Sequence, residues 1–156
     1  MSEATDNTLI LDTTKGPVVI EMRPDLAPGH VARIKELVGQ GFYDGIVFHR
    51  VIDGFMAQTG CPQGTGTGGS GQKLKAEFNR EPHVRGTVSM ARAQSPDSGD
   101  SQFFICFDDA RFLDGKYTVW GKVASGMECV DKIKRGEPPA NPDKMLKVRV
   151  AADVKE

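Results

Sequence analysis

The sequence predicts a mainly β protein, a closed eight-stranded antiparallel barrel capped by two α-helices. Most of the chain consists of short apolar runs separated by clusters of Gly, Pro, Asp and Asn, the pattern of strands joined by tight turns. The 18 glycines and nine prolines fit many turns better than a helical bundle. Strands and helices do not alternate along the chain, which argues against a parallel α/β sheet. Closing the sheet into a barrel removes exposed strand edges.

The first predicted element is a β-hairpin over residues 8–22, which follows a flexible N-terminus of residues 1–7. Its apolar runs, 9–11 and 18–20, flank the turn signal of residues 12–17. The remaining strands are predicted at residues 47–52, 55–59, 87–90, 103–107, 119–123 and 146–150.

Two segments have apolar residues at helical spacing. The first helix is expected to begin at Pro28, where a missing N–H does no harm, and to end at Gly39 or Gly41. The second is expected over residues 127–134 and is stopped by Gly136. Both are short enough to cover the ends of a barrel.

One apolar segment carries a permanently charged guanidinium, that of Arg50. Burial of an unpaired charge is costly, so this arginine needs a reason. Taken alone it would more often be a strand arginine paired with a carboxylate, and the surrounding runs favour a functional role. Asp53-Gly54 is a strong signal for a two-residue hairpin turn. With that turn, Gln58 falls on the opposite face from Arg50, beside His49. The residues that share the face of Arg50 are then Phe48, Ile52, Phe55 and Ala57.

A second apolar run, residues 102–107, completes a pocket beside Arg50. Alternation along a strand places Gln102, Phe104 and Cys106 on one face. Phe104 therefore joins Phe55 as a pocket wall, and Gln102 supplies a directional amide. Three other apolar residues are assigned to the core: Phe48, Phe103 and Ile105.

Such a pocket suits rotation about an X–Pro peptide bond, which has a barrier of roughly 18–20 kcal/mol and takes tens of seconds unaided. A hydrogen bond donated by Arg50 to the prolyl nitrogen would localise its lone pair and favour the twisted state. Aromatic and thioether side chains would hold the ring, while Gln58 or Gln102 fixes the flanking backbone. Each ~1.36 kcal/mol of selective stabilisation gives about tenfold in rate, and neither a metal nor a cofactor is required.

Four segments resemble the cyclophilin family of peptidyl-prolyl isomerases. The first, residues 48–58, reads Phe-His-Arg-Val-Ile-x-Gly-Phe-Met-x-Gln. The other three are residues 86–91, 101–105 and 113–123. The resemblance runs from about Leu9 to Val150 with the motifs in the expected order. It implies a closed eight-stranded antiparallel barrel with two capping helices and a peptidyl-prolyl cis-trans isomerase that assists protein folding.

By this resemblance Arg50, Gln58 and Phe55 form the catalytic group. Gln58 would orient Arg50 and a substrate carbonyl, which conflicts with the simple hairpin register and requires a bulge or strong twist between Gly54 and Gly60. The substrate-binding residues implied in the same way are Met56, Ala91, Arg92, Gln102, Phe104, Phe112, Leu113 and Tyr117. Within this set, the apolar members line or rim the proline pocket, and Ala91, Arg92 and Gln102 contact the residues before the proline.

Three positions depart from the commonest eukaryotic pattern. Phe112 stands where many members carry tryptophan, so the resemblance implies reduced affinity for cyclosporin. Tyr117 replaces a usual histidine and Arg92 a usual asparagine, which affects the residue preferred before proline. Tyr117 and Arg92 look similar to bacterial members.

Two other functions fit parts of the sequence. A binding module of the same fold would hold proline loops of partners with slow turnover, but the intact Arg50, Phe55, Gln58 and Phe104 argue against it. A nucleotide- or phosphate-binding protein would use the glycine loop of residues 64–71. That loop lacks Gly-Lys-Ser/Thr and a helix directly after it, and a flexible loop beside the substrate groove is the better interpretation.

Composition sets the remaining expectations for this single domain of residues 1–156. Twenty basic and 21 acidic residues give a net charge of -1, so no global attraction to nucleic acid or membranes is expected. The widely spaced Cys61, Cys106 and Cys129 and the absence of a signal-like N-terminus predict a cytoplasmic protein without a thiolate zinc site. A thiol hydrolase built on His49 and Cys61 is disfavoured. The expected partners are proline-containing peptides and unfolded or flexible protein segments, and nothing demands more than a monomer.

Overall fold

The computed structural model describes residues 7–151, except residues 65, 67, 93, 94, 96, 137 and 138. The strands are β1 (Thr8–Thr13), β2 (Gly16–Met22), β3 (Ile46–Val47), β4 (Arg50–Ile52), β5 (Met56–Thr59), β6 (Thr87–Met90), β7 (Phe103–Cys106), β8 (Val119–Ser125) and β9 (Lys144–Val150). The helices are α2 (Pro28–Gly39), α3 (Met127–Val130) and the short 3₁₀ helix η1 (Arg111–Leu113). The flexible N-terminus predicted for residues 1–7 lies outside the described residues, apart from Asn7.

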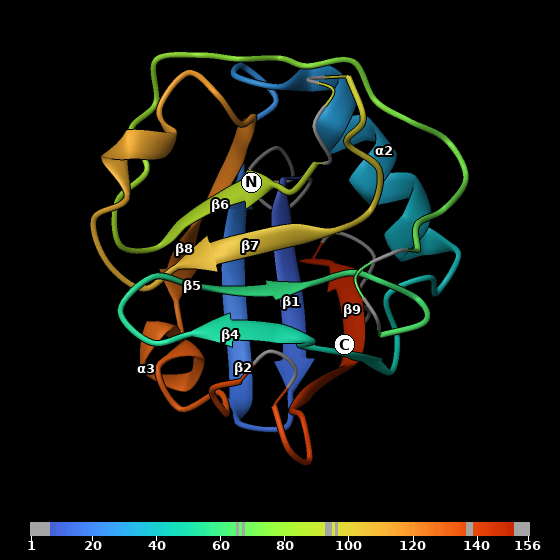
Figure 1. Cartoon of the computed structure of the whole chain (residues 1–156). Helices are drawn as coiled ribbons and strands as arrows, with labels where there is room; N and C mark the ends of the chain where they lie inside the picture. The colour runs from blue at the N-terminus through green and yellow to red at the C-terminus, as the bar shows by residue number, and fades with distance from the viewer. Residues whose placement is uncertain are drawn as a thin grey trace.

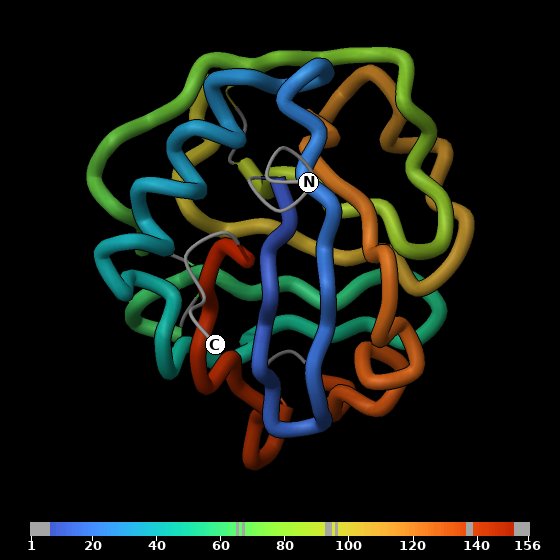
Figure 2. Tube along the Cα trace, turned by 180° about the vertical axis from the view of Figure 1, so that it is seen from behind, coloured from blue at the N-terminus to red at the C-terminus, as the bar shows by residue number. Residues whose placement is uncertain are grey.

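The nine strands form one curled antiparallel sheet in the order β3-β9-β1-β2-β8-β6-β7-β5-β4. The hairpin of β1 and β2, together with β9, runs steeply across β4, β5 and β7, and the same crossing is seen from behind (Figures 1 and 2). Packing of two strand layers in this crossed way leaves an enclosed apolar interior between them. The mainly β class is therefore confirmed.

The predicted count of eight strands is wrong in one place. The single strand expected at residues 47–52 is divided by Phe48 and His49 into β3, which pairs with β9, and β4, which pairs with β5. The division arises because the chain leaves one layer and enters the other, with the Phe48 N–H donated to the Asp143 carbonyl at 2.8 Å. The two end strands of the sheet are thus consecutive in the chain, and the described ladders do not include one that joins them directly.

The helices lie at opposite ends of the sheet (Figure 1), where α2 contacts β9 and α3 contacts β2. The bounds of α2 match the prediction from Pro28 to Gly39. The second helix is shorter than predicted because the chain tightens after Val130 into turns, with the Ile133 N–H donated to the Val130 carbonyl. Both of these apolar residues remain buried. No helix in the described part of the chain is long and apolar enough to cross a membrane.

Strands β5 and β7 are buried on both faces. Ala57, Phe103 and Ile105 point into the main core between the two layers. Met56 and Phe104 point to the other side, into a second, smaller apolar cluster. The alternation predicted for residues 102–107 is therefore confirmed. The smaller cluster forms the base of the site described next.

Candidate active site

The hairpin of β4 and β5 places Arg50 directly opposite Gln58. The observed partners are Arg50 with Gln58, Val51 with Ala57 and Ile52 with Met56. Asp53-Gly54 does form a turn, in which Gly54 has a φ of 73°. Phe55 is left over as one unpaired residue before β5 begins.

This extra residue corrects the register predicted from a two-residue turn. A shift of one residue moves every side chain of a strand to its other face. Gln58 and Met56 therefore lie on the face of Arg50, while Ala57 faces the main core. The bulge that the family resemblance required is present at Phe55, whose N–H is donated to the Ile52 carbonyl and whose carbonyl accepts the Phe107 N–H.

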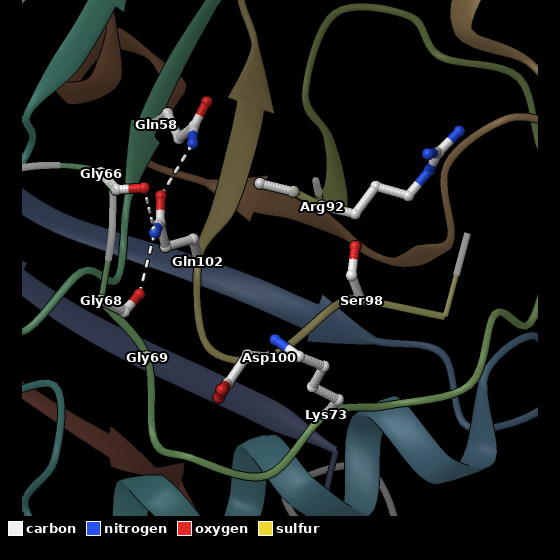
Figure 3. Close-up of a pocket in the computed structure, with 10 residues that line it drawn as sticks. Gln58, Gly66, Gly68, Gly69, Lys73, Arg92, Ser98, Asp100 and Gln102 are labelled. Atoms are coloured by element: carbon white, nitrogen blue, oxygen red, sulfur yellow. Dashed lines mark hydrogen bonds between the residues drawn. The ribbon is translucent and has the colours of Figure 1, made fainter. Parts of the chain in front are cut away.

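A chain of side-chain amides runs from Arg50 into the glycine loop. Arg50 Nη1 lies 3.4 Å from Gln58 Oε1, and Gln58 Nε2 donates to Gln102 Oε1 at 3.0 Å. Gln102 Nε2 in turn donates to the Gly66 and Gly68 carbonyls, each at 2.9 Å (Figure 3). Each amide is thus oriented by its neighbour, and the exposed Arg50 guanidinium is held beside Gln58.

A cavity of about 100 Å³ opens beside this guanidinium. Its base is apolar, since Met56 and Phe104 are buried there with Leu113. Its edges carry the polar ends of Arg50 and Gln58. The lining residues are Arg50, Phe55, Met56, Gln58, Ala91, Arg92, Phe104, Leu113 and Tyr117, all of them predicted site residues.

The two remaining predicted residues, Phe112 and Gln102, lie next to this cavity. The ring of Phe112 packs on that of Phe55 with centroids 5.6 Å apart, and 64% of its surface is exposed. Phe112 therefore forms a rim rather than a wall. Gln102 lines a second cavity.

The second cavity, about 230 Å³ in volume, is lined largely by polar groups (Figure 3). The two cavities share Gln58, Ala91 and Arg92, so together they form one groove. Arg92 Nε donates to the Lys116 carbonyl at 2.8 Å, and its guanidinium lies 4.8 Å from the centre of the Tyr117 ring. This cation–π contact fixes both residues at the junction of the cavities.

The glycine loop borders the groove, as expected, through Gly66, Gly68 and Gly69. Thr65 and Thr67 lie outside the described residues. The Gly66 and Gly68 amides, which a phosphate would need, instead donate to the Cys61 sulfur at 3.3 and 3.2 Å. The Cys61 thiol is thus turned to the loop backbone, which argues against both the phosphate cradle and the thiol hydrolase.

Sequence reasoning missed His83, which lies behind the apolar base of the first cavity. His83 is fully buried, its ring lies 6.1 Å from that of Phe104, and it contacts Asp114 and Ser89. Burial lowers the pKa of His83 and outweighs the opposing effect of Asp114. Burial also raises the pKa of the Cys106 thiol to about 12, so this thiol stays protonated. His83 lies in a loop, where no periodicity marks a side chain as buried.

Comparison with known proteins agrees with this geometry. The profile of the family described as "Cyclophilin type peptidyl-prolyl cis-trans isomerase/CLD" matches residues 8–151. A Brucella suis protein named "Probable peptidyl-prolyl cis-trans isomerase" is 55% identical over 96% of this chain and 85% of its own length. The Bacillus subtilis peptidyl-prolyl cis-trans isomerase B is 47% identical over 85% of this chain and 90% of its own.

Solved structures show the same fold. The cyclophilin AquaCyp293 from Hirschia baltica superposes with a TM-score of 0.90 at 34% identity, covering 97% of this chain and 76% of that one. A Cryptosporidium parvum cyclophilin type isomerase, crystallised in the presence of the dipeptide Ala-Pro, gives a TM-score of 0.85 at 27% identity over 92% and 98% of the two chains. With its fold, its arginine-edged apolar pocket and these relatives, the chain belongs to the cyclophilin family of peptidyl-prolyl cis-trans isomerases.

Proposed function

We propose that Arg50 is the catalytic residue of X–Pro rotation in this chain. Its guanidinium stands at the edge of an apolar cavity, where a donated hydrogen bond can reach the nitrogen of a bound prolyl residue. In the planar ground state the lone pair of that nitrogen is conjugated with the carbonyl, and in the twisted state it is localised and accepts a hydrogen bond. The bond is therefore stronger in the transition state, which is the condition for catalysis.

The proline ring is assigned to the cavity between Phe55, Met56, Phe104 and Leu113. Met56 and Phe104 are only 2% and 3% exposed, so the base on which the ring rests is formed by closely packed side chains. An apolar base also strengthens the hydrogen bond of Arg50, because interactions of a charge weaken in water. No covalent bond forms or breaks, and the substrate leaves with the same atoms that it brought.

The amides of Gln58 and Gln102 are assigned to positioning. Gln102 Nε2 donates both of its hydrogens, to the Gly66 and Gly68 carbonyls, while Gln58 Nε2 donates one of its two hydrogens, to Gln102. Gln58 is thus assigned to orienting Arg50 through Oε1, and its second amide hydrogen is assigned to a substrate carbonyl. The residues before the proline are expected to cross Ala91 and Arg92 into the polar cavity.

The substrates are proposed to be exposed X–Pro segments of peptides and of unfolded or flexible proteins, whose folding the enzyme assists. The Ala-Pro dipeptide used with the Cryptosporidium parvum relative supports a proline ligand. A cytoplasmic location is proposed because all three cysteines are free thiols, as in a reducing compartment. A monomer suffices, since one chain supplies every residue of the groove.

Exchange NMR of a short X–Pro peptide tests this function. Wild type is expected to accelerate cis–trans exchange at catalytic concentration. Arg50→Ala is expected to lose at least about 100-fold of the rate, or ~2.7 kcal/mol, while peptide affinity changes little. Arg23→Ala is the matched control, because Arg23 pairs with Asp25 at a surface away from the groove.

Two measurements separate the rival functions. A pure proline-binding module would bind the peptide and leave exchange at the uncatalysed rate in wild type. A nucleotide-binding protein would be stabilised against heat by nucleotides, which is not expected here because the Gly66 and Gly68 amides are directed to Cys61.

A further inference from the structure

Behind the proline pocket lies a buried polar group formed by His83, Ser89 and Asp114, called here the His83 cluster. His83 Nδ1 is 3.0 Å from Asp114 Oδ1, and Nε2 is 2.9 Å from Ser89 Oγ. The backbone N–H of His83 donates to the same carboxylate oxygen at 2.7 Å. His83 and Ser89 are completely buried, so their mutual contact is made without competition from water, whereas Asp114 is partly exposed.

The protonation pattern of the cluster follows from its partners. An ionised carboxylate only accepts, so Nδ1 of His83 carries the hydrogen that is directed to Asp114. In the neutral ring Nε2 is then an acceptor, and the single hydroxyl hydrogen of Ser89 has two acceptors within reach, this nitrogen at 2.9 Å and the Thr118 carbonyl at 3.0 Å. The three residues resemble a nucleophilic triad in order, but Ser89 has no exposed surface through which a substrate carbonyl could approach. The cluster therefore has a structural role, to position neighbouring groups, rather than a role in a covalent reaction.

The members of the cluster contact two walls of the proline pocket. Ser89 is the direct strand partner of Phe104, from β6 to β7. Asp114 follows Leu113 at the end of η1. The His83 ring itself lies nearly parallel to Phe104, with an interplanar angle of 20°, and edge-on to Tyr117.

A further backbone bond closes the arrangement. The His83 carbonyl accepts the Ala110 N–H at 2.9 Å, and the Ala110 carbonyl accepts the Leu113 N–H at 3.0 Å. The segment that carries Leu113 has no strand pairing of its own, so His83 is its main polar connection to the sheet. Two walls of the pocket, one on the sheet and one on η1, are thus held at a fixed separation by one imidazole.

We propose that His83 is a positioning residue of the isomerase, which sets the width of the proline pocket by joining Phe104 on the sheet to the Leu113 segment. This inference rests on the proposed function only in assigning the proline ring to that pocket. Loss of the imidazole would let the two walls separate and weaken contact with the ring. Arg50 lies at the other edge, so the hydrogen bond to the prolyl nitrogen would be affected less.

The test compares His83→Asn with the matched control His30→Asn. His30 is also a buried histidine with a carboxylate partner, Glu77, but that pair joins α2 to a loop outside the proline pocket. Both variants are expected to lose thermal stability. Only His83→Asn is expected to raise the Kd of an Ala-Pro peptide, by roughly tenfold, since misplacement of a positioning group by about 1 Å can cost up to about 100-fold. The exchange rate at saturating peptide should fall much less than the affinity.

Asp114→Ala provides a second route to the same cluster if His83→Asn does not fold. The Asp114 side chain is 32% exposed, so its removal leaves a smaller buried defect, and it should also raise the peptide Kd. The inference is overturned if His83→Asn and Asp114→Ala, or whichever of the two folds, bind the peptide as tightly as His30→Asn does. Because the readout is affinity, it remains decisive even if wild type failed to accelerate exchange, a result that would overturn the proposed function alone.

Discussion

At the scale of single residues, the polar and the apolar contacts of the groove are made by different side chains. Arg50 is exposed at one edge, while Met56 and Phe104 form a buried base. Phe112 stands apart from both, since 64% of its surface is exposed and its contact is with Phe55. The rim is therefore the part of the site most open to substitution without damage to the fold.

Phe112→Trp tests the expectation that cyclosporin binds this chain with reduced affinity. An indole adds apolar surface at the rim and an N–H donor that phenylalanine lacks. We expect the variant to bind cyclosporin about tenfold more tightly, or ~1.4 kcal/mol, by isothermal titration. Exchange of a short X–Pro peptide should remain within about twofold of wild type. Phe78→Trp is a control at another exposed phenylalanine, and equal gains in the two variants would contradict the role of the rim.

At the scale of elements, the site depends on close approach of backbones as well as on side chains. Gly60 directly follows β5 and has a φ of 97°, and a Cβ placed on it would lie 2.4 Å from the Ser101 carbonyl oxygen and 2.9 Å from Gln102 Cα. The glycine thus allows the strand that carries Gln58 to run against the start of β7. The side-chain amides of Gln58 and Gln102 can then form their hydrogen bond of 3.0 Å.

Gly60→Ala is expected to lower both stability and activity. Left-handed backbone and the overlap with Ser101 and Gln102 together predict a loss of roughly 2–5 kcal/mol in the free energy of unfolding. Gly45→Ala is the control, because Gly45 has a similar φ of 81° with open space around it. It should lose only about 1–2 kcal/mol and keep full activity, as measured by urea unfolding and peptide exchange. Equal losses would show that backbone conformation alone matters at Gly60.

At the scale of the whole molecule, one carboxylate joins three distant parts of the chain. Asp143 accepts the Thr14 hydroxyl at 2.6 Å, from the turn between β1 and β2, and the Lys134 N–H at 2.8 Å, from the segment after α3. Lys15 Nζ lies 3.7 Å away. Burial raises the pKa of Asp143, but these partners outweigh burial, so the pKa lies below its ordinary value of 3.8.

This lowered pKa makes the stability from Asp143 depend on pH. A carboxyl group whose pKa is lower in the folded than in the unfolded state stabilises the fold above the unfolded pKa. That stabilisation is lost as the pH falls through the folded pKa. Asp143→Asn is therefore expected to cost roughly 1–3 kcal/mol near neutral pH and progressively less below about pH 4. Asp53→Asn, at a carboxylate that is 82% exposed, should show no such trend in urea unfolding between pH 3 and 7.

The sequence predicted what depends on local pattern and missed what depends on tertiary geometry. Alternation in residues 102–107 correctly separated Phe104 from Phe103, and Pro28 correctly marked the start of α2. The Asp53-Gly54 signal predicted a turn but not the extra residue, Phe55, because the bulge is held by its contact with Phe107 on β7. The break at Phe48 and His49 was likewise not predicted, because no turn signal there marks the point at which the chain changes layer.

Most of the candidate site was expected from the resemblance, because its residues are concentrated in a few short motifs. The structure adds how they are supported. Cys61 holds the glycine loop through backbone amides a few residues further along an irregular segment, and His83 joins two pocket walls through Ser89 and the more distant Asp114. Such contacts leave no periodic trace in the chain.

The position of the single tryptophan has an optical consequence. Trp120 is completely buried and packs edge-on against Phe103, with ring centroids 5.3 Å apart, on the core side of the sheet rather than in the groove. Its intrinsic fluorescence will thus be emitted from a dry environment in the folded protein and will shift to longer wavelength on denaturation. Because Phe112 stands at the rim in place of an indole, occupancy of the groove will leave this emission almost unchanged. The fluorescence of Trp120 is therefore expected to report unfolding of the chain but not binding of a ligand in the groove.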